Sequence, residues 1–405
     1  MSIDRAASPV WVGHTRGSAE YGRLLAALFC AGVATFAQLY SPQAVLPLIA
    51  ADLRVGAADA ALMVSASTVG LAVGVIPWST LADRIGRVRA ISLSVTIATA
   101  VGLLVPFAPT FELLLTGRFL EGLVVGGVPA IAVAYLSEEI DPRHAARAAG
   151  TFVAGTTIGG LMGRLVSSPV AEVVGWRLGV FTVAVLCAAA ALSFVKLAPR
   201  PRGFTPSSRS GHPEGSLGHR LMANLRSPRQ LALFAQAFLL MGGFVAMYNF
   251  LGFRLMQAPF YLSPFVVSLV FLAYLAGTWT SSRAGAEASR FGRKPVLLVS
   301  IAVMIAGVAI TLSDNVFAVL AGLVIATAGF FGAHSIASGW TGQSAPAGKA
   351  QASSLYNLFY YGGSSAVGWF GGVAFDGGGW TAVAGTILAL AVIAAAAAVL
   401  FLPKN

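Results

Sequence analysis

The sequence predicts an all-α membrane protein with twelve transmembrane helices in two pseudo-symmetric six-helix bundles. Of its 405 residues, 57% are hydrophobic and only 10% are charged, whereas a soluble protein carries about 25% charged residues. Twelve apolar runs are long enough to cross a bilayer. Because lipid offers no hydrogen bonds to an open backbone, each run is expected to be a helix. Features of the first half also recur in the second, and such internal repeats are typical of transporters.

The two predicted bundles span 23–198 and 230–402, between a polar N-terminal tail at 1–22 and a short C-terminus at 403–405. The linker between them, 199–229, is rich in Pro, Ser and Arg and lacks apolar periodicity, so it predicts a flexible connector. In chain order, the apolar runs lie near 23–50, 59–81, 89–109, 112–137, 148–171, 177–198, 230–253, 264–285, 295–313, 316–340, 350–373 and 380–402.

The basic residues predict the orientation of these helices. With both termini in the cytoplasm, the cytoplasmic segments hold 21 of the 26 Lys and Arg residues, as the positive-inside bias requires. The net charge of +11 is therefore expected to orient helices in a membrane and not to bind nucleic acid. The first apolar run is too long for a signal-peptide core, so we expect it to be a retained helix.

A short basic loop at 79–89 separates the second run from the third, and a weaker copy at 285–294 separates the eighth from the ninth. Asp83 is a carboxylate among cations near a helix end, where the N–H groups of a neighbouring helix could stabilise its negative charge. We expect such a loop to latch the two halves in one conformation; the alternative is a plain anchor of arginines. The expected latch residues are Asp83, Arg84, Gly86, Arg87, Arg290, Gly292 and Arg293.

The 79–89 loop resembles the signature between the second and third helices of the major facilitator superfamily. Arg118-Phe119-Leu120-Glu121-Gly122 resembles that superfamily's Arg-x-x-Gln-Gly motif, and Tyr40-Ser41-Pro42-Gln43 is similar to a first-helix pattern of its drug:proton antiporters, in the acriflavine-sensitivity branch. The resemblance implies a protein of the bacterial inner membrane that works by alternating access around a central cavity. It also implies proton-coupled efflux of hydrophobic or cationic small molecules. It implies the proton gradient as the energy source, with no cofactor, and we expect the chain to act as a monomer.

Small residues lie four apart on four of the predicted helices, which lets helix backbones approach closely. The resemblance implies that these helices line the seam between the halves, pairing the second with the eleventh and the fifth with the eighth. The alternative is static packing. The stripes are Ala66, Gly70 and Gly74; Gly155, Gly159 and Gly163; Ala273, Gly277 and Ser281; and Ser364, Gly368 and Gly372.

Ionisable residues inside the apolar runs are candidates for proton coupling, because a charge in the bilayer normally has a partner or a task. Glu121 is three residues from Arg118, close enough to pair on a helix, and Arg164 is predicted at a similar depth. Glu121 would either take up a proton between the two arginines or remain a permanently ionised strut. His334 would either titrate or pack as a hydrogen-bonded residue.

Two predicted helices look interrupted in their middle, the first at Pro42 and the seventh at Gly242-Gly243. Breaks at corresponding positions of two halves point to a substrate site, although each aromatic residue there could equally be ordinary core. The candidate substrate-binding residues are Gln38, Tyr40, Met247, Tyr248, Asn249, Tyr356, Asn357, Tyr360 and Tyr361.

Other classes of function are disfavoured or left open. The sequence has no Walker loop, metal-ligand spacing or nucleophile elbow, so we do not expect an enzyme or an ATP-driven pump. Its two cysteines lie inside apolar runs and predict no disulfide framework or metal cluster. Proton-coupled uptake of a sugar, metabolite or organic anion bound by Arg118 or Arg164 is one alternative. A non-transporting membrane receptor or assembly partner is another.

Overall fold

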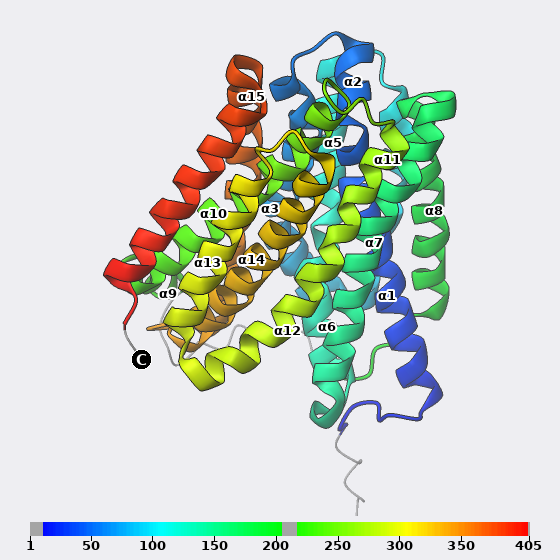
Figure 1. Ribbon diagram of the computed structural model, residues 1–405. Helices are drawn as coiled ribbons and strands as arrows, with labels where there is room; N and C mark the ends of the chain where they lie inside the picture. The colour runs from blue at the N-terminus through cyan, green and yellow to red at the C-terminus, as the bar shows by residue number, and fades with distance from the viewer. Residues whose placement is uncertain (1–10, 205–216, 404–405) are drawn as a thin grey trace, which may run out of the picture.

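The computed structural model describes residues 11–204 and 217–403. The parts of the predicted tail, linker and C-terminus at 1–10, 205–216 and 404–405 lie outside the described residues. The N-terminal half consists of helices linked by short turns (Figure 1). Its elements are α1 (Ala19–Tyr40), the 3-10 helix η1 (Gln43–Val45), α2 (Leu46–Leu53), α3 (Ala57–Ile85), α4 (Arg87–Leu104), η2 (Val105–Phe107), α5 (Phe111–Val125), α6 (Gly127–Glu139), η3 (Pro142–His144), α7 (Ala145–Val174) and α8 (Trp176–Leu197).

The C-terminal half has the same character. Its last helix is bent at Gly378 and Gly379, whose backbone leaves the helical region, with φ of +61° at Gly379. Two consecutive membrane helices therefore meet at this bend. The elements of this half are α9 (Leu217–Leu225), α10 (Pro228–Leu255), α11 (Pro264–Ser268), η4 (Leu269–Ala273), α12 (Tyr274–Phe291), α13 (Arg293–Ile310), α14 (Val316–Gln343) and α15 (Lys349–Phe401).

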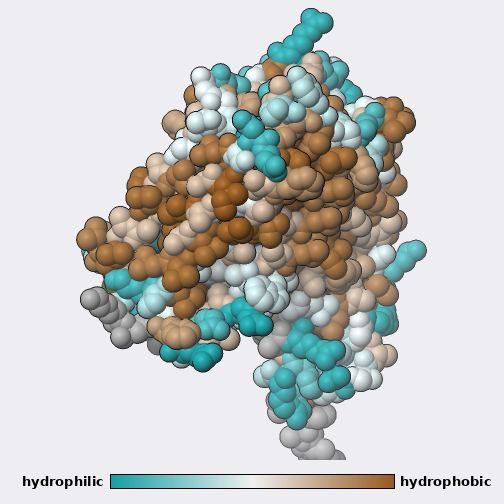
Figure 2. All heavy atoms as spheres, viewed as in Figure 1, coloured by the Kyte–Doolittle hydropathy of each residue, from teal (hydrophilic) through white to brown (hydrophobic). Residues whose placement is uncertain are grey.

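The described residues contain the membrane-length helices that the hydropathy predicts. Ten segments are long and apolar enough to cross a bilayer. Dividing α15 at its bend and adding α7, which has 30 residues, brings the described chain to twelve. On the face seen in Figure 2, apolar residues form a band between two more polar ends. The all-α membrane fold predicted from the sequence is confirmed.

The two halves repeat one packing scheme. In the first, α1 packs against α7 and α3 against α5; in the second, α10 packs against α15 and α12 against α14. Between the halves, α3 contacts α15 and α7 contacts α11. These are the second-with-eleventh and fifth-with-eighth pairings that the sequence resemblance implied.

The predicted helix breaks are only half correct. The first membrane span is broken after Tyr40 and continues through η1 and α2, because Pro42 has no N–H to continue the hydrogen-bond ladder. The predicted break in the seventh span is wrong, since α10 is continuous through Gly242 and Gly243. Glycine keeps its N–H, so a packed helix tolerates it. The eighth span is broken instead, with 3-10 geometry in η4.

The linker is also more ordered than predicted, because residues 217–225 form the helix α9. Leu221 and Leu225 pack against the core of the C-terminal half, and the Asn224 side chain donates a hydrogen bond to the Ala347 carbonyl at 2.6 Å. Two leucines four residues apart lie on one helix face, a short periodicity that the polar composition of the linker obscures.

Most of the small-residue stripes pack inside one half. A Cβ atom on Gly74 would lie 2.1 Å from the Leu123 carbonyl oxygen in α5, and one on Gly163 would lie 2.3 Å from the Ala37 carbonyl oxygen in α1. On α15, by contrast, a Cβ on Gly372 would lie 2.2 Å from Cα of Ala58 in the other half. The small residues of α3 and α7 therefore let helices of the same half pack closely. Those of α15 let the two halves approach each other at the seam.

The two ends of the bundle differ. The first and last described residues lie at one end, here called the terminal side, and the opposite end is called the far side (Figure 1). On the terminal side the halves separate around an opening of about 480 Å³ lined by residues of α3, α6, α9 and α15. On the far side, α3 and α15 are joined by direct hydrogen bonds. The structure is thus open toward the terminal side and closed on the far side.

Candidate functional site

A cavity of about 150 Å³ lies between the two halves at the centre of the molecule. Helices α1 and α7 of one half and α10, α12, α14 and α15 of the other contribute its walls. Aromatic rings dominate the lining, and Arg164 is its charged member. The lining residues are Phe36, Tyr40, Thr156, Thr157, Gly160, Arg164, Met241, Phe244, Tyr274, Phe331 and Tyr360.

Arg164 is 3% exposed and is held in place by polar atoms and rings. Its Nε and Nη2 atoms donate to Gln43 Oε1 at 2.8 and 2.5 Å, and Nη1 donates to the Gly160 carbonyl at 2.8 Å. The guanidinium lies 4.3 to 5.0 Å from the ring centroids of Tyr40, Phe271 and Tyr274. Among the described residues, none of these partners is a carboxylate. The cavity therefore holds a buried positive charge that the protein does not neutralise.

Arg118 and Glu121 form a separate buried pair on α5, 1% and 2% exposed. Arg118 also donates to the carbonyls of Met63 at 2.9 Å and Leu39 at 2.6 Å, and to Ser67 Oγ at 2.7 Å. A longer bond of 3.3 Å reaches the Gln38 carbonyl. In an unbroken helix that carbonyl would accept from residue 42, which is a proline without an N–H. Arg118 thus supplies the donors that the break in the first span removes.

The prediction that Glu121 lies between two arginines is not what the structure shows. Among the described residues, Arg118 and Arg164 have no hydrogen-bond partner in common, and Gln43, not Glu121, accepts from Arg164. Equal depth in neighbouring helices does not bring two side chains together, because each must also point toward the other. Whether Glu121 takes up a proton stays a prediction.

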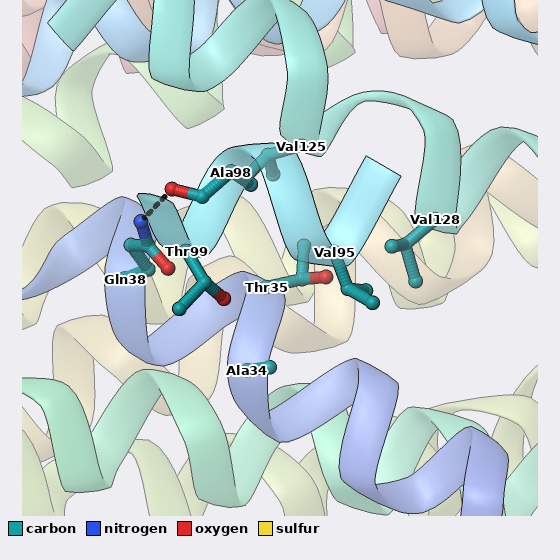
Figure 3. A pocket seen from close by; sticks show the side chains of 8 residues that line it. All are labelled: Ala34, Thr35, Gln38, Val95, Ala98, Thr99, Val125 and Val128. Carbon is teal, nitrogen blue, oxygen red and sulfur yellow. Dashed lines mark hydrogen bonds between the residues drawn. The ribbon is translucent and has the colours of Figure 1, made fainter. Parts of the chain in front are cut away.

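Gln38, which was predicted to bind substrate, lies outside the central cavity. Its Nε2 atom donates to the Ala98 carbonyl of α4 at 2.6 Å, as Figure 3 shows. The narrow space beside it, lined also by Thr35 and Thr99, has no volume that a water molecule could enter. Gln38 precedes Tyr40 by two residues, which on a helix places them on nearly opposite faces. Tyr40 is therefore the one that faces the cavity.

The other predicted substrate residues divide into four groups. Tyr360 lines the central cavity, whereas Asn357 and Tyr361 line the opening on the terminal side. Met247 and Tyr248 are buried and do not line the central cavity, and the Tyr248 hydroxyl lies 2.8 Å from Thr327 Oγ1.

Asn249 and Tyr356 form the fourth group, in which each side chain bonds another candidate site residue or its neighbour. Asn249 Oδ1 accepts from Gln43 Nε2 at 2.6 Å, across the two halves. The Tyr356 hydroxyl lies 3.0 Å from His334 Nδ1, and the His334 ring stacks on Phe330. His334 is thus hydrogen-bonded in the aromatic core, as the packing alternative expects.

The predicted latch residues make their contacts within their own halves. Arg87 bonds Asp83 at 2.5 Å and Glu138 at 2.9 Å, Arg84 is exposed, and Arg293 donates to Gln343. Arg290 lies 5.5 Å from the centroid of its neighbour's ring. Gly86 and Gly292 adopt φ of +94° and +88°, which favours glycine. In this conformation, no bond of Asp83 to the other half is present among the described residues.

Several cavity residues escaped the sequence reasoning. Thr156, Thr157 and Gly160 lie about one and two turns before Arg164 on α7, so the helical period from that arginine could have found them. Tyr274 and Phe331 had no such signal, because they come from other helices. Gln43 was visible only as part of the motif at the helix break.

Comparison with known proteins identifies the family. The sequence profile described as "Major Facilitator Superfamily" matches residues 27–287. This chain belongs to the major facilitator superfamily. It is 40% identical to the inner membrane transport protein YnfM of Escherichia coli, over 94% of this chain and 90% of that protein. It is 35% identical to the uncharacterized MFS-type transporter YybF of Bacillus subtilis, over 94% and 93% of the two chains.

Solved structures of the superfamily share the fold. A point mutant of the nucleoside transporter NupG covers 94% of this chain and 100% of its own, with a TM-score of 0.78 and 17% identity. A bacterial homologue of the human lysosomal transporter Spinster, in an inward-facing and occupied conformation, covers 95% and 97%, with a TM-score of 0.78 and 16% identity. The protein is therefore a multi-pass membrane transporter of this superfamily and not an enzyme.

Proposed function

We propose that this transporter carries a small organic anion with an aromatic or apolar body across a bacterial inner membrane by alternating access. The observation that carries the proposal is the guanidinium of Arg164, which is buried in the central cavity without a carboxylate partner among the described residues. A buried charge is costly unless it is paired, and a planar guanidinium suits carboxylate and similar anions because it can donate two parallel hydrogen bonds.

The shape of the cavity supports a small, flat cargo. A dry cavity of about 150 Å³ accommodates a benzene-sized molecule, and the space beside Arg164 has about this volume. The rings of Phe36, Phe244 and Phe331 provide apolar walls, against which an aromatic ring packs favourably. The charge of Arg164 argues against a cationic cargo, because like charges repel strongly at low dielectric.

The sidedness supports alternating access. The positive-inside bias places the terminal side in the cytoplasm, so this conformation would open its cavity inward. Because one chain supplies both halves of the cavity, we propose that the monomer is the working unit.

A pair of probes with permanent and opposite charges tests the cargo class. Proteoliposomes with an imposed pH gradient are assayed with benzenesulfonate and with trimethylphenylammonium, which both carry a single ring and do not cross lipid unaided. We expect gradient-dependent flux of the anion. In Arg164→Gln, the affinity for benzenesulfonate should fall about 30-fold or more, since truncating one partner of a buried charged contact costs about 2 kcal/mol or more. Arg164→Lys should retain part of the affinity for benzenesulfonate.

Proton-coupled efflux of hydrophobic or cationic compounds is a second candidate, favoured by the aromatic cavity walls and by the resemblance to drug:proton antiporters. It predicts flux of trimethylphenylammonium and indifference to Arg164→Gln. If neither probe moves under any gradient while both bind, the non-transporting alternative gains support. The direction of flux follows from the sign of the pH gradient that drives accumulation.

We also propose the proton as the coupling ion, with Glu121 as its carrier. Glu121→Gln should then abolish gradient-driven transport but spare exchange of cargo at equal pH. Because the side chain is already paired with Arg118, a purely structural role predicts equal losses of both activities.

A further inference from the structure

On the far side, two carboxylates each bind the start of a membrane span in the other half, and Ser168 Oγ donates to the Pro264 carbonyl at 2.7 Å beside one of them. Asp376 of α15 accepts from the backbone N–H groups of Ala57 at 3.0 Å and Ala58 at 3.2 Å, the first two residues of α3. Glu172 of α7 accepts from the N–H of Phe265 at 2.9 Å, at the start of the eighth span. Together these three bonds to the carboxylates are called the far-side gate.

The gate is symmetric under the internal repeat. Glu172 and Asp376 are 204 positions apart, the same offset as between Gly175 and Gly379. Their targets, Ala57 and Phe265, are 208 positions apart, the same offset as between Phe36 and Phe244. Glu172 of the first half binds the second half, and Asp376 of the second half binds the first. The two contacts are therefore equivalent under the internal repeat. A chance surface contact would not be expected to occur twice in this crossed form.

Helix α3 is built to receive its cap from the other half. Its N-cap residue is Gly56, which has no side chain that could accept from the first N–H groups of the helix. A Cβ atom on Gly56 would lie 2.9 Å from Asp376 Oδ2, so the glycine also makes room for the carboxylate. An anion at a helix N-terminus satisfies free donors and interacts favourably with the helix dipole. Here that stabilisation exists only while the halves touch.

We propose that Glu172 and Asp376 hold the transporter closed on the far side and must release α3 and the eighth span before the cavity can open there. This inference goes beyond the cargo of the proposed function and requires only that the halves rock apart. Both carboxylates remain exposed to solvent, so water can replace each broken bond. The contact is therefore suited to repeated opening and closing.

Distance measurements between two spin labels test the gate without any transport assay. The labels are attached to cysteines at Leu104 and Phe317, which are 73% and 77% exposed and lie at the far-side ends of α4 and α14. Cys30 and Cys187 are replaced by alanine. The double variant Glu172→Ala with Asp376→Ala lacks both helix-capping carboxylates. It should raise the ratio of molecules open on the far side to closed molecules about tenfold. Glu112→Ala, which removes an exposed carboxylate of α5 on the same side, is the control.

A local capping role is separated from a gating role by supplying the cap within α3 itself. Gly56→Ser on the Asp376→Ala background should restore thermal stability, because serine is a good N-cap, yet leave the far side open. Asp376→Asn, which can still accept one hydrogen bond, should give an intermediate population and serves if the alanine variants fold poorly. Unchanged distance distributions in the double variant, or full closure restored by Gly56→Ser, would overturn the proposal. Failure of the anion assay would leave this result standing.

Discussion

The pair formed by Arg118 and Glu121 gives a prediction whose size follows from the contacts. Replacing Glu121 by Gln keeps an acceptor for Arg118 and leaves its four other hydrogen bonds intact. Because a bond to a charged acceptor is stronger than one to a neutral acceptor, we expect the free energy of unfolding to fall by about 1–3 kcal/mol. The guanidinium still has three backbone carbonyls around it.

Replacing Arg118 by Met should cost much more. It breaks a buried ion pair from one side, which costs about 3–5 kcal/mol, and it removes the donor to the Leu39 carbonyl, which adds about 1–3 kcal/mol. We therefore expect a loss of about 4–8 kcal/mol in total. In the double variant Arg118→Met with Glu121→Leu, the ion-pair part should be recovered, because two apolar residues leave no buried charge. The part from the Leu39 carbonyl should remain.

Equilibrium unfolding in mixed micelles of dodecyl maltoside and sodium dodecyl sulfate measures these differences. Arg118→Met should be the least stable of the three, whereas the double variant and Glu121→Gln should both lie about 1–3 kcal/mol below the wild type. If Arg118→Met were no less stable than Glu121→Gln, Arg118 would not be the residue that repairs the broken first span. If the double variant were as unstable as Arg118→Met, the unpaired charge of Glu121 would contribute little to the loss of stability.

Two further predictions concern packing and pH. Gly122→Ala should destabilise the protein by about 1–3 kcal/mol, because the new Cβ would lie 1.9 Å from the Ser67 carbonyl oxygen. Gly150→Ala should be neutral or slightly stabilising, because no described atom lies within 4 Å of the new Cβ. Thermal unfolding in detergent compares the two variants. Hydrogen bonds from Arg143 lower the pKa of Asp141 to about 2, so its contribution to stability is present above its ordinary pKa and is lost only as the pH falls toward 2. Asp141→Asn should therefore leave the shape of the stability profile between pH 5 and 8 unchanged, and a change of shape in thermal unfolding across that range would contradict the assignment.

The fold was predictable because membrane helices are specified by local properties. Hydropathy and length define the spans, and the missing N–H of Pro42 defines the break in the first one. The membership of the cavity was not predictable in the same way, because it depends on how each helix is rotated about its axis. Gln38 and Tyr40 are two residues apart, yet one faces α4 and the other the cavity. The aromatic partners of Arg164 come from distant helices, so no spacing in the sequence connects them to it.

The side-chain amide of Gln43 joins two contacts that the sequence keeps far apart. Its oxygen accepts from Arg164 in the cavity, and its nitrogen donates to Asn249 in the C-terminal half. A planar amide cannot turn at one end and stay still at the other. Any solute that draws the Arg164 guanidinium away from this oxygen therefore also disturbs the bond to Asn249. Occupancy of the cavity is in this way coupled to a contact between the two halves.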